Sequence, residues 1–216
     1  LIIFFLFLLG IFMTFVSSKI LSKTVLKGQP SSFTLELPPY RAPKIGSTIV
    51  RSIFDRTLYV LGRAAVVALP AGILIWLLAN INVLDMSILR YITDFFDPFA
   101  RLMGLDGVIL TAFILGFPAN EIVIPIAIMA YTASGELVPM DNLVELKDIL
   151  IANGWTLNTA ICTIIFSLMH WPCSTTCLTM FKETKSWKWT LIGIALPTIC
   201  GILACMLITA ISGLIV

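Results

Sequence analysis

The sequence predicts an all-α protein that crosses a membrane several times and contains broken or re-entrant helices. Of its 216 residues, 59% are hydrophobic and 12% are charged, about half the charged fraction of an average soluble domain. Long apolar runs alternate with polar stretches, and two runs are interrupted by prolines beside polar residues. This composition excludes a water-soluble globule and a disordered chain. A net charge of +2 provides no basic surface for nucleic acid.

The N-terminal part, residues 1–56, combines one apolar run with a basic loop. The run 1–16 is shorter than the roughly 20 residues of a bilayer span, so we predict a transmembrane helix cut at its front end, in the C-terminal portion of a longer protein. Residues 17–56 carry seven basic and two acidic side chains, which predicts a cytoplasmic loop by the positive-inside rule. Its last part, 45–56, is predicted to be an amphipathic helix on the membrane surface.

Residues 57–216 are predicted to form a transmembrane domain whose spans lie near 57–79, 108–131, 155–178 and 190–215. Residues 80–107 are predicted to be an interfacial helix pair on the outer side, broken at Pro98 and Gly104. The loop charges favour a re-entrant hairpin for 108–131, because that arrangement leaves the acidic loop 134–153 outside and the lysines of 182–188 inside. A kinked full span is the alternative.

The run 108–131 carries a carboxylate at its proline break. The sequence GFPANE at 116–121 brings Pro118, Asn120 and Glu121 together, and Pro125 follows as a second interruption. A carboxylate near the bilayer centre costs about 2.5–3.5 kcal/mol on insertion scales, so such residues usually face an internal path. We therefore predict that Glu121 binds a cation or compensates its charge, with Pro118 and Asn120 lining the same path. The alternative is a carboxylate near the interface or one that caps the broken helix.

The second break, at 170–177, gathers potential metal ligands. Its sequence HWPCSTTC contains the chain's only histidine, a helix-breaking proline, two cysteines four residues apart and three hydroxyl residues. This mixed set suits a borderline divalent transition metal, whereas Mg²⁺ and Ca²⁺ prefer oxygen ligands. The alternative is that the thiols fill space and the histidine bonds a neighbour. The predicted metal ligands are Cys173, His170 and, more weakly, Cys177; the predicted path-lining residues are Pro172, Ser174, Thr175 and Thr176.

Two broken helices with polar residues at their breaks indicate a substrate site near the membrane midplane of a transporter. We therefore expect the two breaks to meet, so that Glu121 and the turn at Cys173 line one water-filled path. The chain contains no phosphate-binding loop, zinc-protease motif or hydrolase nucleophile motif. No enzyme activity is predicted for this segment.

Four motifs together closely resemble the C-terminal membrane half of the ferrous iron transport protein B (FeoB) family. They are LPPYR at 37–41, GFPANEI at 116–122, HWPCSTTC at 170–177 and ETKSWKWT at 183–190. The resemblance implies a multi-pass Fe²⁺ uptake permease of a bacterial or archaeal plasma membrane, built from two Gate repeats of which this chain holds the second. It places the family's gate motif on Pro172 and Cys173. Fe²⁺ is then the transported substrate, and no structural cofactor is expected.

The resemblance also implies partners outside this chain. These are an upstream membrane half and a cytoplasmic GTPase domain of the same polypeptide, where GTP and Mg²⁺ bind, and a small FeoA-like accessory protein. Three other classes stay open. They are a nucleoside or other small-solute carrier of the Gate type, a membrane scaffold that transports nothing, and an intramembrane thiol enzyme in which His170 activates Cys173.

Overall fold

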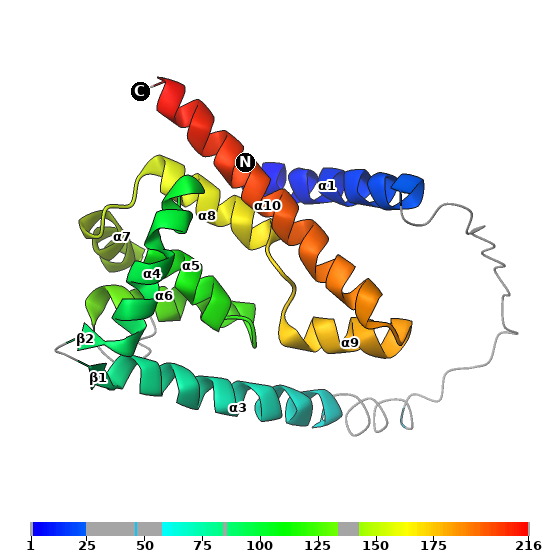
Figure 1. The fold of residues 1–216 in the computed structure, drawn as a ribbon, viewed down its shortest axis with the longest axis horizontal. Coiled ribbons are helices and arrows are strands. Elements are labelled where there is room, and N and C mark those ends of the chain that lie inside the picture. The colour runs from blue at the N-terminus through cyan, green and yellow to red at the C-terminus, as the bar shows by residue number, and fades with distance from the viewer. Residues whose placement is uncertain (1, 25–45, 47–57, 84–85, 134–142, 216) are drawn as a thin grey trace, which may run out of the picture. The chain divides into compact units, whose positions relative to one another are not determined.

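The computed structural model describes residues 2–24, 46, 58–83, 86–133 and 143–215, and these are almost entirely helical (Figure 1). The predicted all-α class is therefore confirmed. The chain divides into two compact units, residues 1–66 and 67–216. Within the described part, three helical segments are long and apolar enough to cross a membrane: Phe4–Lys23, Leu157–Thr184 and Trp187–Leu214.

In the first unit, helix α1 (Ile2–Thr24) is longer than the predicted run 1–16. The helix continues past Val16 and includes two lysines near its end, where long side chains can reach the membrane interface. Its large side chains are exposed, as expected for a helix in lipid; Phe15, for example, is 71% exposed. The predicted loop beyond Thr24 and the predicted amphipathic helix 45–56 lie outside the described residues, apart from residue 46.

Helix α3 (Tyr59–Asn80) covers the predicted run 57–79 from residue 59 onward and is followed in the second unit by a small hairpin. Strands β1 (Asn82–Val83) and β2 (Met86–Ser87) pair in antiparallel fashion. Ser87 then caps α4 (Ile88–Leu102) by accepting a hydrogen bond from the backbone N–H of Arg90 at 3.3 Å. Two-residue strands are too short to give a sequence pattern, which is why the hairpin was not predicted.

The predicted break at Pro98 is wrong, because α4 runs through this residue. Proline removes the N–H that would bond the carbonyl of Asp94, but both residues lie on the exposed face, so the carbonyl is not buried. The chain breaks instead around Gly104, as predicted, and α5 (Gly107–Leu115) is bent by 109° from α4. Gly104 has a φ of +69°, and a Cβ there would overlap the Thr209 hydroxyl, so glycine suits this elbow.

Helices α5 and α6 (Val123–Thr132) form a helical hairpin, joined by residues 116–119 and the short 3-10 helix η2 (Asn120–Ile122). The interruption lies at the predicted tip. A Cβ on Gly116 would come within 2.5 Å of the Val123 Cγ2 atom, so glycine lets the chain turn this tightly. The prediction that Pro125 interrupts the chain is wrong. Pro125 lies in the first turn of α6, where backbone N–H groups have no partner within the helix.

The remaining helices are α7 (Leu143–Ala152), α8 (Leu157–Met169), α9 (Ser174–Thr184) and α10 (Trp187–Ile215). Helix α7 occupies part of the predicted acidic loop. Helices α8 and α9 are separated by the predicted break before Cys173, and α10 packs against both of them. Figure 1 shows α10 as the long orange and red helix that passes α8 and α9.

The core of the second unit lies between α4, α5, α6, α8 and α10. Phe113 of α5 and Phe166 of α8 meet edge to face at 5.0 Å between ring centroids. Cys162 of α8 and Cys205 of α10 are fully buried, and the Cys205 thiol donates to the Cys162 carbonyl at 3.4 Å. The first contact packs the hairpin against α8, the helix that leads to the second break, and the second joins α8 to α10.

Candidate functional site

The two breaks meet at Ser174, the first residue of α9. Its backbone N–H donates to the Phe117 carbonyl at 2.9 Å, and its hydroxyl donates to the Pro118 carbonyl at 3.4 Å. The first N–H groups of a helix have no partner within that helix. The carbonyls of the hairpin tip satisfy Ser174 instead. The second break therefore lies against the first, as the sequence predicts.

Cys173 occupies the N-cap position of α9 at this junction. Its sulfur lies 3.1 Å from the Thr175 hydroxyl oxygen and 3.2 Å from that of Thr176, and the residue is half-buried. Hydroxyl donors and the positive end of a helix dipole both favour negative charge on a sulfur at this position. The position thus suits a thiolate.

Cys177 points back toward the break. It is buried one turn into α9, where its backbone N–H bonds the Cys173 carbonyl at 3.0 Å and its thiol donates to the Pro172 carbonyl at 3.4 Å. The turn around Pro172 lies between α8 and α9, so carbonyls in it, including that of Pro172, lie outside the hydrogen-bond pattern of either helix. The Cys177 thiol satisfies one of them, which gives this residue a structural role at the junction.

His170 is buried among aromatic rings at the end of α8. Its Nδ1 atom lies 2.9 Å from the Ser167 carbonyl and 3.1 Å from the Phe166 carbonyl. Two acceptors require Nδ1 to carry the hydrogen, which leaves Nε2 as an acceptor. Nε2 is buried and has no hydrogen-bond partner within the described residues. His170 therefore caps α8 with one nitrogen and keeps a free lone pair on the other.

Glu121 and Asn120 lie in η2, one turn beyond the residues that touch Ser174, and both are exposed. In the part of the chain that the structure describes, no three side chains among histidine, cysteine, aspartate and glutamate gather into a group that could hold a metal ion. The structure brings Pro118, Pro172, Cys173 and Ser174 together with their hydroxyl neighbours. It does not bring His170, Glu121 and both thiols into one ligand set.

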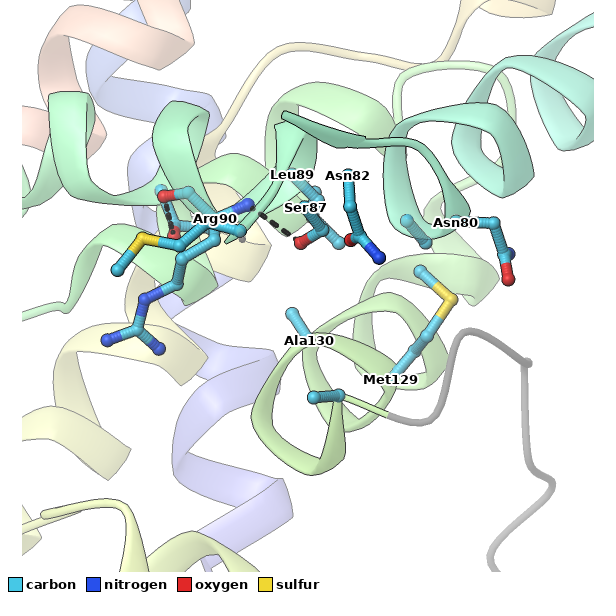
Figure 2. Close-up of a pocket in the computed structure, with 11 residues that line it drawn as sticks. Asn80, Asn82, Ser87, Leu89, Arg90, Met129 and Ala130 are labelled. Atoms are coloured by element: carbon cyan, nitrogen blue, oxygen red, sulfur yellow. Dashed lines mark hydrogen bonds between the residues drawn. The ribbon is translucent and has the colours of Figure 1, made fainter. Parts of the chain in front are cut away.

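A pocket of about 470 Å³ lies elsewhere in the second unit, between the end of α3, the β1–β2 hairpin, α4 and α6. Figure 2 shows Asn82 and Ser87 facing Met129 and Ala130 of α6 across this space. None of the predicted site residues lines it. The candidate site is thus defined by the contact between the two breaks and not by this pocket.

One hydrogen-bonded line was not predicted from the sequence. Trp155 Nε1 donates to the Tyr131 hydroxyl oxygen at 2.8 Å, and the Tyr131 hydroxyl donates to Asp106 Oδ2. Asp106 also caps α5 by accepting from the Ile109 N–H at 2.7 Å. An aspartate just before an apolar run is an N-cap signal that could have been recognised. Its partner Tyr131, 25 residues away, and Trp155, a further 24 residues along, leave no such signal.

Two family models match the chain. The Gate model, described as "Nucleoside recognition", matches residues 61–187, which is more than half of the chain. A model described as "Ferrous iron transport protein B C terminus" matches residues 3–55. The second break and the hairpin tip both fall within the Gate match. No solved structure matches the chain significantly.

Curated relatives named "Fe(2+) transporter FeoB" match over most of this chain. The protein of Staphylococcus aureus strain COL is 32% identical over 202 residues, covering 90% of this chain and 29% of the relative. That of Leptospira interrogans strain 56601 is 28% identical over 211 residues, covering 86% and 29%. That of Methanocaldococcus jannaschii is 25% identical over 221 residues, covering 96% and 31%. The chain thus spans less than a third of the length of these relatives.

Proposed function

The chain belongs to the Gate family and carries the C-terminal membrane region of ferrous iron transport protein B, and from this premise we propose that it forms part of a pathway for Fe²⁺ uptake across the membrane. The observation that carries the proposal is the junction of the two breaks. Ser174 bonds the hairpin tip through both its N–H and its hydroxyl, and Cys173 stands beside it. A sulfur ligand, hydroxyls and unwound backbone then occupy one place in the protein.

The chemistry of this donor set supports a soft or borderline divalent ion. A thiolate binds Fe²⁺ more readily than it binds Mg²⁺ or Ca²⁺. We propose Cys173 as the principal ligand, with hydroxyls, backbone carbonyls and water completing the shell. Such a shell binds more weakly than a closed site of three or four side chains, and weak binding suits an ion that must leave again.

His170, Cys177 and Glu121 take different roles in this proposal. His170 lies two residues before Pro172, and its Nε2, which has no hydrogen-bond partner among the described residues, can act as a second ligand when the turn moves. Cys177 supports the turn through the Pro172 carbonyl. Glu121, exposed near the hairpin tip, supplies negative charge that attracts a cation toward the junction. Asn120, Thr175 and Thr176 line the approach.

The proposed pathway also requires parts of the transporter that are not contained in this chain. We infer that an upstream membrane half completes the path and that a cytoplasmic domain of the same polypeptide binds GTP with Mg²⁺ and drives or gates it. A FeoA-like accessory protein would bind on the cytoplasmic side. The membrane is the plasma membrane of a bacterium or an archaeon, the two domains of life that the relatives represent.

The test is substitution of the thiol in the intact transporter. We expect Cys173→Ser to lower Fe²⁺ uptake into vesicles by about tenfold or more, because a hydroxyl is a poor ligand for a borderline metal. Cys200→Ser makes the same chemical change in α10, at a residue that belongs to neither break, and should leave uptake unchanged. Both variants should keep their GTP hydrolysis. Normal uptake by Cys173→Ser would remove this residue from the pathway.

A second candidate function follows from the description of the Gate model as "Nucleoside recognition". Asn120 offers an exposed carboxamide near the junction, a group that can bond a nucleobase. Vesicles that contain the reconstituted transporter should take up radioactive Fe²⁺ but not radioactive uridine. Uridine uptake that is not inhibited by excess Fe²⁺ would favour a nucleoside carrier.

A further inference from the structure

We propose that Asp106, Tyr131 and Trp155 are positioning residues for the ion site, acting from the opposite end of the α5–α6 hairpin. The inference rests on the proposed function, because it concerns the placement of the same junction. The three side chains form one hydrogen-bonded line that joins the base of the hairpin to the start of α8.

The chemistry of the groups fixes the direction of this line. An indole nitrogen only donates, so the Tyr131 oxygen must accept from Trp155. The single tyrosine hydrogen is then available for Asp106, whose Oδ2 accepts it while Oδ1 accepts the Ile109 N–H. With Asp106 as a carboxylate, every group in the line therefore has one role. The line is therefore directional and specific in a way that apolar packing is not.

The line connects three elements that lead to the junction. Asp106 begins α5, Tyr131 lies in the last turn of α6, and Trp155 lies just before α8. Helix α5 has nine residues and so extends about 14 Å from this base to the hairpin tip. Helix α8 ends at the second break. The hairpin and α8 are thus held together at one end, and at the other end the hairpin tip contacts Ser174 of α9, the helix that follows α8 across the second break.

The intervening contacts do not fix this placement alone. The faces of α5 and α6 that share the core are apolar and combine small residues such as Ala112 and Ala127 with larger ones such as Phe113. Apolar contacts resist separation but are non-directional, whereas a hydrogen bond weakens steeply when its geometry changes. The Asp106–Tyr131–Trp155 line thus sets the height of the hairpin tip relative to Ser174 and Cys173.

The experiment measures Fe²⁺ uptake by the intact transporter in vesicles over a range of Fe²⁺ concentrations. Tyr131→Phe keeps the ring and removes only the hydroxyl. We expect KM for Fe²⁺ to rise about tenfold, the effect of losing a hydrogen bond to a charged group, with the maximal rate per folded transporter little changed. Tyr91→Phe is the matched control, because the Tyr91 hydroxyl donates to the Val83 carbonyl of β1, at 3.1 Å, and this bond does not involve the α5–α6 hairpin. Its KM should be that of the parent.

Two further variants show whether the line acts as a unit. Trp155→Phe leaves the bond between Tyr131 and Asp106, so KM should rise only about threefold. This milder variant also provides the test if Tyr131→Phe fails to accumulate. Combining Tyr131→Phe with Asp106→Asn should raise KM no more than the stronger single change, because both remove the same contact.

A purely structural role predicts a different pattern. If Tyr131→Phe and Trp155→Phe lower the maximal rate in proportion to lost folded protein and leave KM unchanged, the positioning role is overturned. The result for Cys173→Ser separates the two proposals. Should Cys173→Ser reduce uptake while Tyr131→Phe leaves KM unchanged, the ion site stands and only the positioning role fails. Should Cys173→Ser have no effect, the proposed function itself fails.

Discussion

Ser174 is the residue through which the two breaks touch, and each of its polar groups has a separate partner. The N–H bonds the Phe117 carbonyl and the hydroxyl bonds the Pro118 carbonyl, at 2.9 and 3.4 Å. The shorter bond uses the backbone, so side-chain truncation alone removes only the weaker contact. The backbone geometry also allows a stronger test, because the preceding residue, Cys173, has φ −61° and ψ 159°, which is compatible with a following proline.

We predict that Ser174→Pro uncouples the breaks without unfolding α9. Proline is well tolerated at the first position of a helix, yet it lacks both the N–H and the hydroxyl. Fe²⁺ uptake should fall about tenfold or more, whereas Ser174→Ala should cost about 1 kcal/mol or less at the junction and reduce uptake only slightly. Circular dichroism of the purified variants checks that helix content is retained. Equal uptake by both variants would show that the backbone contact is dispensable.

At the scale of elements, the hairpin depends on close approach at its tip. Gly116 is buried, and a Cβ there would lie 2.5 Å from Val123 Cγ2 and 2.9 Å from the Ala112 carbonyl oxygen. The carbonyl belongs to the backbone of α5 and cannot rotate away. Any side chain at this position would therefore push the tip away from α6 and displace the carbonyls that Ser174 uses.

Gly116→Ala should destabilise the protein by about 1–3 kcal/mol through overpacking, and should lower its thermal unfolding temperature in detergent. Gly72→Ala is the matched control, because a Cβ at Gly72 in α3 meets nothing within 4 Å and alanine favours a helix. The control should unfold at or above the parent temperature. A Gly116→Ala protein as stable as the parent would mean that the tip relaxes without cost.

The sequence predicted the helices better than it predicted the breaks and contacts between them. Helix-breaking residues marked the gaps at Gly104, Gly116 and Pro172 because their effect is local. Pro98 and Pro125 were misjudged, since the cost of a proline depends on whether the bond it removes would be exposed or lies in the first turn. The Tyr131–Asp106 contact could not be predicted from the sequence, because only tertiary packing brings together residues so distant in the chain. The burial of His170 followed from the same packing.

At the scale of the whole molecule, the side of the membrane on which each loop lies depends on whether residues 108–131 enter and leave the membrane on the same side. The α5–α6 hairpin has the form of a re-entrant element, with two short helices packed together and a break between them. A re-entrant hairpin leaves Glu145 of α7 outside the cell and Lys182 of α9 inside. A full span would place Glu145 inside the cell and Lys182 outside.

We predict that Glu145→Cys is labelled by a membrane-impermeant maleimide on intact cells, and that Lys182→Cys is labelled only after permeabilisation. The parent protein, with its five native cysteines, gives the background labelling. The charge distribution across the membrane favours this result. The reverse pattern would establish a kinked full span and would move the three lysines of 182–188 to the outer side.

The junction joins the hairpin to α9 mainly through main-chain atoms, and this has a consequence for divergence. The Phe117 and Pro118 carbonyls and the Ser174 N–H exist whatever side chains surround them. Under the proposed function, substitution of Cys173, Thr175 or Thr176 would therefore change the ligands offered to an ion while these main-chain bonds remain. We expect variants selected for manganese or zinc uptake to change at these side chains and to keep the contact between Ser174 and the hairpin tip.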